Sequence, residues 1–358
     1  MQGLGNIINI QPFSLARHEK TELFMDVLHK LTKYHYANCP KYRRILDTFG
    51  FDVNIKHPIE DIPFIPVRLF KDYELLSVEK SQIIKTMVSS GTTGQSVSKI
   101  FLDQITAANQ AKVLAKIISN FTGTKRLPIL IIDTKSVVRD RSLISARGAG
   151  ILGFSMLGYD ITYALREDMQ LDFDAMELFC NKHRDETILL FGFTYMIWEY
   201  FYKKLAESSK KLALENSILI HGGGWKKMDE EAVDNDTFKR LLNDVCRIKR
   251  IYNYYGMVEQ AGSIFMECEA GYLHSSIFSD VIMRRVDFSM CSTRETGLIQ
   301  LLSLLPLSYP GDIILSEDRG EIIGEDDCSC GRLGKYFKIH GRIKDAEIRG
   351  CSDTYASN

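Results

Sequence analysis

A loop rich in glycine and hydroxyl residues is the first part of the sequence that could do chemistry. It runs Ser89-Ser90-Gly91-Thr92-Thr93-Gly94 and reaches Lys99 five residues later, between the apolar-biased segments 83–88 and 100–102. Glycine lets a backbone approach a ligand closely, and backbone N–H groups, hydroxyls and a lysine can bind phosphate oxygens. The spacing differs from that of a G-x-x-x-x-G-K-[ST] P-loop, because Lys99 does not directly follow the second glycine. Alone, the loop is equally consistent with a phosphate site and with a polar hairpin.

Four other segments combine glycine with polar or aromatic residues, and each follows a predicted strand. They are His221–Trp225, Tyr255–Glu259, Tyr309–Asp312 and Gly341–Gly350. In an open α/β sheet, ligands bind outside the carboxyl ends of the strands. A carboxylate such as Glu259 at that position can hold Mg²⁺, which prefers oxygen ligands. Taken singly, each segment is also consistent with an ordinary turn or a helix start, and Pro-Gly-Asp is a common turn.

Together and in this order, the five segments resemble the motifs of adenylate-forming enzymes, the superfamily of acyl-CoA synthetases and luciferases. Val258 and Pro310 depart from the pattern, because each stands where a hydroxyl residue is usual. The resemblance implies that the 89–94 loop binds phosphate, that Glu259 holds Mg²⁺ and that the glycines of His221–Trp225 border the adenine. Asp312 and Arg342 are implied to contact the ribose. The resemblance also implies that Lys99 and Glu259 are catalytic. The implied ATP and Mg²⁺ site consists of Ser89, Ser90, Gly91, Thr92, Thr93, Gly94, Lys99, Gly222, Gly223, Gly224, Tyr255, Gly256, Glu259, Asp312 and Arg342.

The segment Arg349-Gly350-Cys351 lies near the end of the chain and offers a nucleophile. The thiolate is the nucleophilic form of cysteine, and a neighbouring cation such as Arg349 lowers the pKa of a thiol. Gly350 would let the segment swing, so that Cys351 could attack an activated acyl group and form a thioester. For an arbitrary chain end, a cysteine without function would be the commoner explanation.

Longer strings of sequence give the resemblance its most specific form. They resemble the acyl-protein synthetases of the bacterial-bioluminescence fatty acid reductase, and the strings are Thr86–Leu102, His221–Lys227, Tyr255–Ser263, Cys328–Phe337 and Glu347–Tyr355. The resemblance implies an enzyme that adenylates a fatty acid with ATP, holds the acyl group on Cys351 and passes it to a partner reductase. The chain ends eight residues after Gly350. The usual small C-terminal domain of adenylate-forming enzymes is therefore expected to be missing, with residues 342–358 as a hinge-like tail.

Three cysteines and a histidine form a second set of residues with recognisable chemistry. Cys268 and His274 lie on one predicted turn, and Cys328 and Cys330 lie on another. Cys₃His is a standard zinc set in which protein atoms fill all four positions. Cys-x-Cys is a less usual ligand spacing than Cys-x-x-Cys, and four reduced side chains without a metal are the alternative. Some phenylacetate-CoA ligase-like relatives are implied to carry a structural zinc in this region.

The composition narrows the class of protein. The chain of 358 residues is 45% hydrophobic and 25% charged, which is typical of globular proteins. Its formal net charge of −1 gives no broad reason to bind nucleic acid or an anionic membrane. No apolar run approaches the roughly 18 residues of a membrane span, and the N-terminal segment lacks the features of a signal peptide. The eight cysteines then favour reduced thiols, a metal site or catalysis, and a cytoplasmic location is expected.

The elements that position these residues are expected to form an α/β fold, that of the large N-terminal domain of adenylate-forming enzymes. Predicted strands and helices alternate over residues 83–255, which favours a mostly parallel sheet flanked by helices. Short strands after residue 255 predict a small antiparallel part, and residues 139–158, which contain four glycines, predict a long loop. The expected division is a helical lead-in over 1–80, an α/β nucleotide-binding core over 81–260, a β-rich subdomain over 261–341 and the tail over 342–358.

These observations leave three functional hypotheses. The first is an ATP-dependent acyl-protein synthetase that acts on a carboxylic acid, with long fatty acids and an acyl reductase partner implied by the resemblance. The second is an acyl- or aryl-CoA ligase that works without the small domain. The third is a non-catalytic, nucleotide-binding subunit of a reductase complex. A thioester on Cys351 distinguishes the first hypothesis, release of a CoA thioester the second, and nucleotide binding without turnover the third.

Overall fold

The chain forms two compact units, each assembled from segments that are distant in sequence. The computed structural model describes residues 7–89, 97–139, 143–208, 210, 212–225 and 231–343. The first unit takes in Met1–Ser89, Gln95–Ile117 and Gly256–Glu347, and the described residues of the second lie within Ile118–Tyr255. The first unit therefore combines the predicted helical lead-in with the predicted β-rich part.

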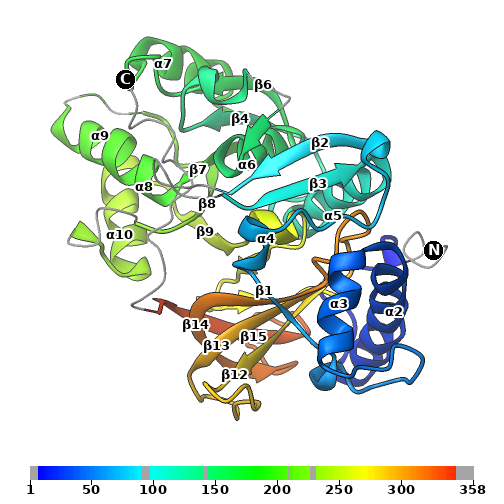
Figure 1. Ribbon diagram of the computed structural model, residues 1–358. Helices are drawn as coiled ribbons and strands as arrows, with labels where there is room; N and C mark the ends of the chain where they lie inside the picture. The colour runs from blue at the N-terminus through cyan, green and yellow to red at the C-terminus, as the bar shows by residue number, and fades with distance from the viewer. Residues whose placement is uncertain are drawn as a thin grey trace. The chain divides into compact units, whose positions relative to one another are not determined.

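The second unit is built on a parallel sheet with the strand order β9-β8-β7-β4-β6. The strands are β4 (Leu127–Ile131), β6 (Gly158–Tyr163), β7 (Ile188–Phe193), β8 (Ser217–Gly222) and β9 (Arg250–Tyr255), and β5 (Leu143–Ser145) lies outside this order. The helices are η3 (Lys135–Val138), α6 (Ala146–Ser155), α7 (Phe173–Lys182), α8 (Thr194–Met196), a π-helical turn (Ile197–Tyr202), α9 (Lys203–Glu207) and α10 (Asn235–Cys246) (Figure 1). Every residue of β7 and β8 is buried, which explains the apolar runs 188–191 and 218–220 in the sequence.

The first unit contains an antiparallel sheet with the order β12-β13-β14-β15-β11-β10, and β1 pairs in parallel with β14. Its strands are β1 (Ile65–Pro66), β10 (Phe265–Glu267), β11 (Leu273–His274), β12 (Ser279–Arg284), β13 (Gly297–Ser303), β14 (Ile313–Glu325) and β15 (Lys335–Arg342), with the hairpin of β2 (Ile83–Val88) and β3 (Lys99–Asp103). Its helices are α2 (Arg17–Asn38), α3 (Pro40–Thr48), α4 (Leu69–Asp72), the first part of α5 (Gln104–Thr122) and the 3₁₀ turns Ile59–Asp61, Lys80–Gln82 and Val258–Gln260. A buried ion pair fixes α2 to the sheet, because the Lys20 ammonium lies 3.4 Å from the carboxylate of Asp280 on β12.

The prediction of a long loop over residues 139–158 is wrong, because α6 occupies much of this segment. The Ser145 hydroxyl caps the helix by accepting a hydrogen bond from the Gly148 N–H at 3.1 Å. The glycines allow close packing, since a β-carbon at Gly150 would lie only 2.9 Å from the Phe193 ring. The sequence pattern was therefore misread: glycine here marks the approach of a neighbouring strand to a helix.

Helix caps also explain two other boundaries. Asp172 caps α7, since its carboxylate accepts a hydrogen bond from the Ala175 N–H at 3.1 Å. α10 begins at Asn235, because the Asp234 carboxylate accepts a hydrogen bond from the Thr237 N–H at 2.8 Å. The strands after residue 255 are not all short as predicted, since β14 runs over Ile313–Glu325.

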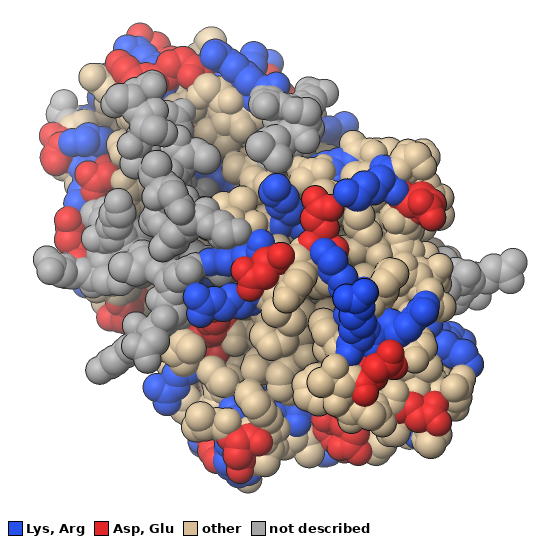
Figure 2. All heavy atoms as spheres, viewed as in Figure 1, with Lys and Arg blue, Asp and Glu red and all other residues tan. Residues whose placement is uncertain are grey.

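Charged residues of both signs are interspersed on the face shown in Figure 2, in line with the formal net charge of −1. Among the described residues, no helix combines the length and the apolar character that a bilayer crossing requires.

Candidate functional site

The hairpin of β2 and β3 carries the predicted phosphate loop. Its base is closed by two hydrogen bonds, from the Ser89 N–H to the Ser98 carbonyl at 3.0 Å and from the Ser98 N–H to the Ser89 hydroxyl at 2.9 Å. Lys99 begins β3 opposite Val88, and its side chain is exposed. The loop residues lie outside the described part of the chain, namely Ser90, Gly91, Thr92, Thr93 and Gly94. The described ends of the loop thus leave Lys99 accessible to a ligand.

Glu259 and Asp312 are far apart in the sequence, but Tyr309 and Gln260 bring their turns together. Glu259 is 3% exposed in a single 3₁₀ turn. The Tyr309 hydroxyl donates to the Glu259 carbonyl oxygen at 2.8 Å, and the Gln260 side-chain amide donates to the Gly311 carbonyl oxygen at 2.8 Å. The residue predicted to hold Mg²⁺ and the residue predicted to bind ribose therefore lie on two turns that hydrogen-bond to each other.

Asp312 is itself 1% exposed and lies beside His35 of α2, with 3.7 Å between Asp312 Oδ1 and His35 Nε2. Asp312 Oδ2 is buried without a hydrogen-bond partner among the described residues. Burial raises the pKa of Asp312 to about 7 and lowers the pKa of His35 to about 3. Both shifts have one cause, since desolvation favours the neutral form of each group. The ribose contact of Asp312 stays a prediction.

The remaining predicted nucleotide residues lie at strand ends. Tyr255 is the last residue of β9 and is half-buried, and the exposed Gly256 follows it. Arg342 is the last residue of β15, and its Nε lies 3.4 Å from a carboxylate oxygen of Asp318 on β14. Cys351, the residue predicted to carry the acyl group, lies outside the described residues.

The three glycines after β8 meet different constraints. Gly222 ends β8, and a β-carbon there would collide with the ring of Tyr254 on β9. Gly223 has a φ of +82°, and a β-carbon there would lie 3.2 Å from the Phe193 ring, whereas Gly224 has open space around it. The first two glycines thus let aromatic rings approach the backbone. This apolar setting is compatible with a planar base, and the adenine contact stays a prediction.

The residue before these glycines, His221, packs inside the second unit. It is 2% exposed, and its Nδ1 lies 2.9 Å from the Thr194 hydroxyl. Its ring centroid is 4.6 Å from that of Phe238. Burial lowers the pKa of His221 to about 3, so the ring is neutral at physiological pH. The imidazole of His221 therefore packs against the ring of Phe238 in the interior of this unit.

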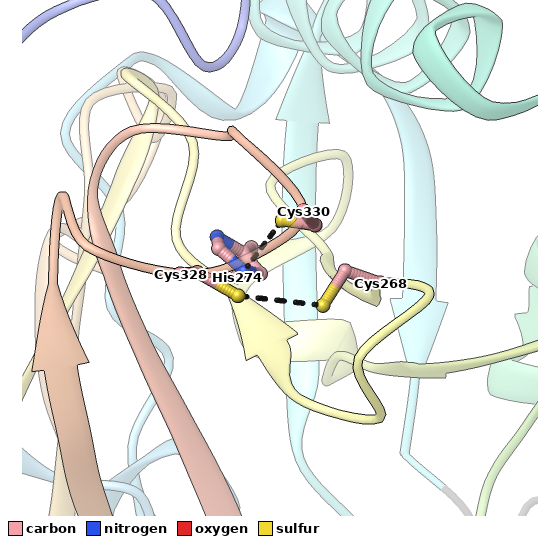
Figure 3. A group of neighbouring side chains, drawn as sticks. All are labelled: Cys268, His274, Cys328 and Cys330. Atoms are coloured by element: carbon pink, nitrogen blue, oxygen red, sulfur yellow. Dashed lines mark hydrogen bonds between the residues drawn. The ribbon is translucent and has the colours of Figure 1, made fainter.

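Cys268, His274, Cys328 and Cys330 converge in the first unit, as the sequence predicts (Figure 3). Their ligand atoms all lie within 4.8 Å of one another. Cys268 follows β10, His274 lies on β11, and the other two cysteines occupy the turn between β14 and β15. Because β11 pairs with both β10 and β15, the sheet itself brings the two turns together.

Glycine closes both of these turns. The Gly271 N–H donates to the Cys268 carbonyl at 2.9 Å, and the Gly331 N–H donates to the Cys328 carbonyl at 3.0 Å. The two glycines have φ angles of +80° and +78°, a region that favours glycine over other residues. These backbone hydrogen bonds hold both turns in place, and the Arg332 N–H additionally donates to Cys330 Sγ at 3.5 Å.

Two distances in this cluster match the edges of a tetrahedral zinc site. Cys268 Sγ and Cys328 Sγ are 3.9 Å apart, and His274 Nε2 is 3.4 Å from Cys330 Sγ. Zn–S bonds of about 2.3 Å and Zn–N bonds of about 2.0 Å require tetrahedral edges of roughly 3.8 Å for S···S and 3.5 Å for S···N. Burial lowers the pKa of His274 to about 4, so its imidazole is neutral, as a metal ligand must be. These four residues are therefore able to hold zinc.

Sequence reasoning assigns no individual role to Tyr309, Gln260 or Gln110, although the structure places all three around the Glu259 turn. The Gln110 side-chain amide lies 3.4 Å from the Tyr309 hydroxyl. One signal was available, because Gln110 precedes Leu114 and Ile117 by four and seven residues, the spacing of one helix face. A polar residue on an apolar face indicates a buried hydrogen bond.

The fold is that of adenylate-forming CoA ligases. A crystal structure of an open conformation of 2-hydroxyisobutyryl-CoA ligase, in complex with 2-HIB-AMP and CoA, matches with a TM-score of 0.71, covering 94% of this chain and 77% of that chain at 15% identity. A postadenylation-state structure of the same ligase, in complex with 2-HIB-AMP, gives a TM-score of 0.72 at 15% identity, covering 94% and 70%. At this identity the likeness establishes the fold alone. It confirms the predicted α/β fold class.

The sequence defines the family within that class. A family model described as acyl-protein synthetase, LuxE, matches residues 4–358, so the chain belongs to this family. The chain is 23% identical to the long-chain-fatty-acid–luciferin-component ligase of Vibrio harveyi, over 95% of this chain and 89% of that protein. It is 25% identical to the Aliivibrio fischeri protein of the same name, over 98% and 92%. It is also 30% identical to the phenylacetate-coenzyme A ligase of Thermus thermophilus, over 94% and 73%. The resemblance predicted from the motifs is confirmed.

Proposed function

We propose that this chain is an ATP-dependent acyl-protein synthetase that adenylates a carboxylic acid and then carries the acyl group as a thioester on Cys351. The observation that carries the proposal is membership of the acyl-protein synthetase family over residues 4–358. The names of the Vibrio and Aliivibrio relatives favour a long-chain fatty acid as the substrate. The hydrogen bonds between the Glu259 and Asp312 turns support the proposal, because two predicted nucleotide motifs are thereby held together.

The assignment of residues to ATP follows the family motifs. The 89–94 loop and Lys99 bind phosphate oxygens, the 222–224 turn with Tyr255 and Gly256 borders the adenine, and Asp312 and Arg342 bind the ribose. Glu259 would hold Mg²⁺, whose positive charge would balance the charge of the pyrophosphate leaving group. The protein contributes mainly the orientation of the two reactants.

The proposed reaction has two chemical steps. A carboxylate oxygen of the acid attacks the α-phosphorus of ATP, and pyrophosphate leaves as the acyl-adenylate forms. The Cys351 thiolate, its proton already lost to solvent, then attacks the acyl carbonyl carbon, and AMP leaves with the former carboxylate oxygen. The hinge-like tail over 342–358 would carry the acyl thioester to an acceptor on a partner reductase.

A panel of carboxylic acids in the ATP–pyrophosphate exchange assay tests the first step, and labelled acid tests the second. We expect exchange with long-chain acids and a hydroxylamine-labile acyl label that disappears in Cys351→Ser. Cys291→Ser is the matched control, since Cys291 is a partly exposed cysteine on which no motif falls. Absence of acid-dependent exchange, or a thioester label that persists in Cys351→Ser, would refute the proposal.

The relationship to phenylacetate-coenzyme A ligase favours one alternative, an acyl- or aryl-CoA ligase. If this chain is such a ligase, it would release stoichiometric CoA thioester, and Cys351→Ala would not change the yield. Binding of ATP without any exchange would indicate instead a non-catalytic nucleotide-binding subunit.

The Cys268, His274, Cys328 and Cys330 cluster is proposed to hold a structural zinc ion. Four protein ligands leave no open position for a substrate, so the metal would stabilise the fold of the β-rich part over 261–341. The basis is that the Cys268–Cys328 and His274–Cys330 distances match the edges of a tetrahedral site.

A further inference from the structure

We propose that Tyr309 is a positioning residue, the centre of a buried hydrogen-bond network that sets Glu259 and the phosphate-loop hairpin in register for adenylation. The network is defined by Tyr309, Ser308, Gln260, Gln110 and Gly311. The inference rests on the proposed function, because that function gives Glu259 and the hairpin their roles. It adds residues to which the nucleotide motifs assign no individual role.

The hydroxyl group of Tyr309 uses both its donor and its acceptor capacity inside the protein. The side chain is completely buried. Its O–H donates to the Glu259 carbonyl oxygen at 2.8 Å, and its oxygen lies 3.4 Å from the Gln110 side-chain amide, which can donate to it. Burial, reinforced by the nearby Glu259 carboxylate, raises the pKa of Tyr309, so the hydroxyl keeps its proton. The backbone of the predicted metal residue is thus anchored from α5 through Tyr309.

Gln260 completes the connection in the opposite direction. It is 2% exposed, and its side-chain amide donates to the carbonyl oxygens of Gly311 at 2.8 Å and of Leu301 at 3.2 Å. Each turn therefore donates a side-chain hydrogen bond to the backbone of the other. Such reciprocal bonds fix both the distance and the orientation of the two turns.

Gly311 is required for this close approach. A β-carbon at this position would collide with the Tyr309 ring and would lie 3.0 Å from the Glu259 carbonyl oxygen. The turn therefore brings the Tyr309 ring, the Gly311 backbone and the Glu259 carbonyl into direct contact. This packing leaves little room for the Glu259 turn to shift.

Ser308 extends the network to the phosphate-loop hairpin. Its hydroxyl donates to the Phe101 carbonyl oxygen of β3 at 2.7 Å, and its N–H donates to the Thr106 hydroxyl at 3.1 Å. Lys99 begins the same strand, two residues before Phe101. Two adjacent residues, Ser308 and Tyr309, therefore link the strand that carries the predicted phosphate-binding lysine to the turn that carries the predicted metal ligand.

A positioning role and a purely structural role make different predictions. Buried hydrogen bonds stabilise any fold, so loss of stability alone does not discriminate between the two roles. Misplacement of a reacting group by about 1 Å can cost about 10²-fold in rate, even when the fold is intact. The discriminating measurements are therefore the Mg²⁺ requirement, the affinity for MgATP, and the separation of kcat from KM.

The test uses Tyr309→Phe in the full chain, assayed by ATP–pyrophosphate exchange and by calorimetric binding of MgATP. We expect kcat to fall about tenfold, the equivalent of one lost hydrogen bond realised in the transition state. We expect the Mg²⁺ concentration for half-maximal rate and the Kd for MgATP to rise, while the KM for the acid is unchanged. Ser308→Ala, which releases β3, should raise the KM for ATP and leave the Mg²⁺ requirement near that of the wild type.

Ser217→Ala is the matched control, because Ser217 in the second unit is also completely buried and donates its hydroxyl to a backbone carbonyl, that of Leu214. It should lower the melting temperature without changing any catalytic constant.

If Tyr309→Phe lowers the melting temperature in the same way and keeps the wild-type Mg²⁺ requirement and MgATP affinity, the network is structural and the inference fails. If Tyr309→Phe does not fold, Gln110→Leu and Ser308→Ala decide, and wild-type constants in both overturn the inference. A wild-type protein without exchange or MgATP binding would instead refute the proposed function, and the inference with it.

Discussion

Two regions of the first unit are held in place by opposite means. Around Tyr309, the turns that carry Glu259 and Asp312 are joined by side-chain donors that end on backbone carbonyls. Around Cys268, hydrogen bonds close each turn separately, and the three sulfurs and the His274 imidazole face one another. The first region is held by hydrogen bonds within the protein, although Asp312 Oδ2 and the Gln260 side-chain oxygen have no hydrogen-bond partner among the described residues. The second region brings together groups that gain most from a cation at their centre.

The protonation states of buried groups show the same difference between the two regions. Burial raises the pKa of the Cys268 thiol to about 12, so this thiol by itself stays neutral and contributes little to cohesion. A zinc ion would favour the thiolate and turn the cluster into a strong cross-link between β10, β11 and the turn between β14 and β15. In the Tyr309 network the hydroxyl stays protonated and no metal is needed. Removing one side chain should therefore have different consequences in the two regions.

The largest effect is expected in the cysteine–histidine cluster. Cys328→Ser should abolish stoichiometric zinc and lower the free energy of unfolding by at least about 3 kcal/mol, a part of the roughly 10–16 kcal/mol that zinc supplies in zinc-finger peptides. Elemental analysis of protein purified without an immobilised-metal column, together with denaturant unfolding, measures both quantities. Treatment of the wild type with a strong chelator should produce the same loss of stability.

Cys246→Ser supplies the control for this prediction. Cys246 is 3% exposed on α10 of the second unit, so the variant also places a serine at a buried cysteine position, but away from the cluster. It should keep its zinc. The contrast between the two regions disappears if wild-type protein contains no zinc and Cys328→Ser costs no more than Cys246→Ser.

A smaller effect, on rate rather than on stability, is expected from Glu259→Gln. The substitution removes the carboxylate charge but keeps the backbone carbonyl that accepts from Tyr309, so the network survives. We expect exchange to fall about 10²-fold, the size of effect seen when one electrostatic stabiliser is lost from an active site. Thermal unfolding should change little. Initial exchange rates at saturating ATP across a range of Mg²⁺ concentrations give the measurement.

Glu267→Gln provides the comparison, because Glu267 is a 2% exposed carboxylate on β10 of the same unit. Its exchange rate should equal that of the wild type. A Glu259→Gln protein with wild-type exchange would show that the Tyr309 network positions something other than a metal ligand.

The sequence was informative where local spacing decides the structure. Cys268 with His274, and Cys328 with Cys330, lie on short glycine turns, so two of the three contacts needed for a zinc set are local. The Tyr309 network could not be predicted, because its hydrogen bonds join residues 50 and 199 positions apart. The prediction for 139–158 failed for a related reason. Glycine is usually a loop signal, and only the tertiary contact of Gly150 with Phe193 shows that it serves packing here.

Asp312 is a second case in which the sequence does not predict a long-range contact. The motif identifies this aspartate as a ribose ligand, but no sequence pattern indicates that its side chain would be 1% exposed beside His35. Burial against a helix from the start of the chain is set by tertiary packing alone. The consequence for its pKa is therefore accessible only from the structure, and it leads to the prediction with the smallest expected effect.

Asp312→Asn should change the pH dependence of stability. The pKa of Asp312 is raised from 3.8 to about 7 in the folded chain, so between these values the folded state binds more protons than the unfolded state. The stability that Asp312 contributes is present in full below pH 3.8 and is lost as the pH rises toward about 7. The neighbouring His35, whose pKa is lowered from 6.5 to about 3, acts in the opposite direction over an overlapping range. The difference between variant and wild type isolates the aspartate.

The Asn variant should thus gain stability relative to the wild type as the pH rises from about 4 to about 7, as measured by denaturant unfolding at a series of pH values. Asp280→Asn is the contrasting variant. Although burial opposes it, Lys20 and Lys335 lower the pKa of Asp280, so its contribution is lost only at lower pH. Asp280→Asn should therefore be less stable than the wild type by a nearly constant amount across the same range. Parallel pH profiles for the wild type and Asp312→Asn would mean that Asp312 is ionised and solvated in the folded chain. That result would favour its prediction as a ribose ligand over the buried placement next to His35.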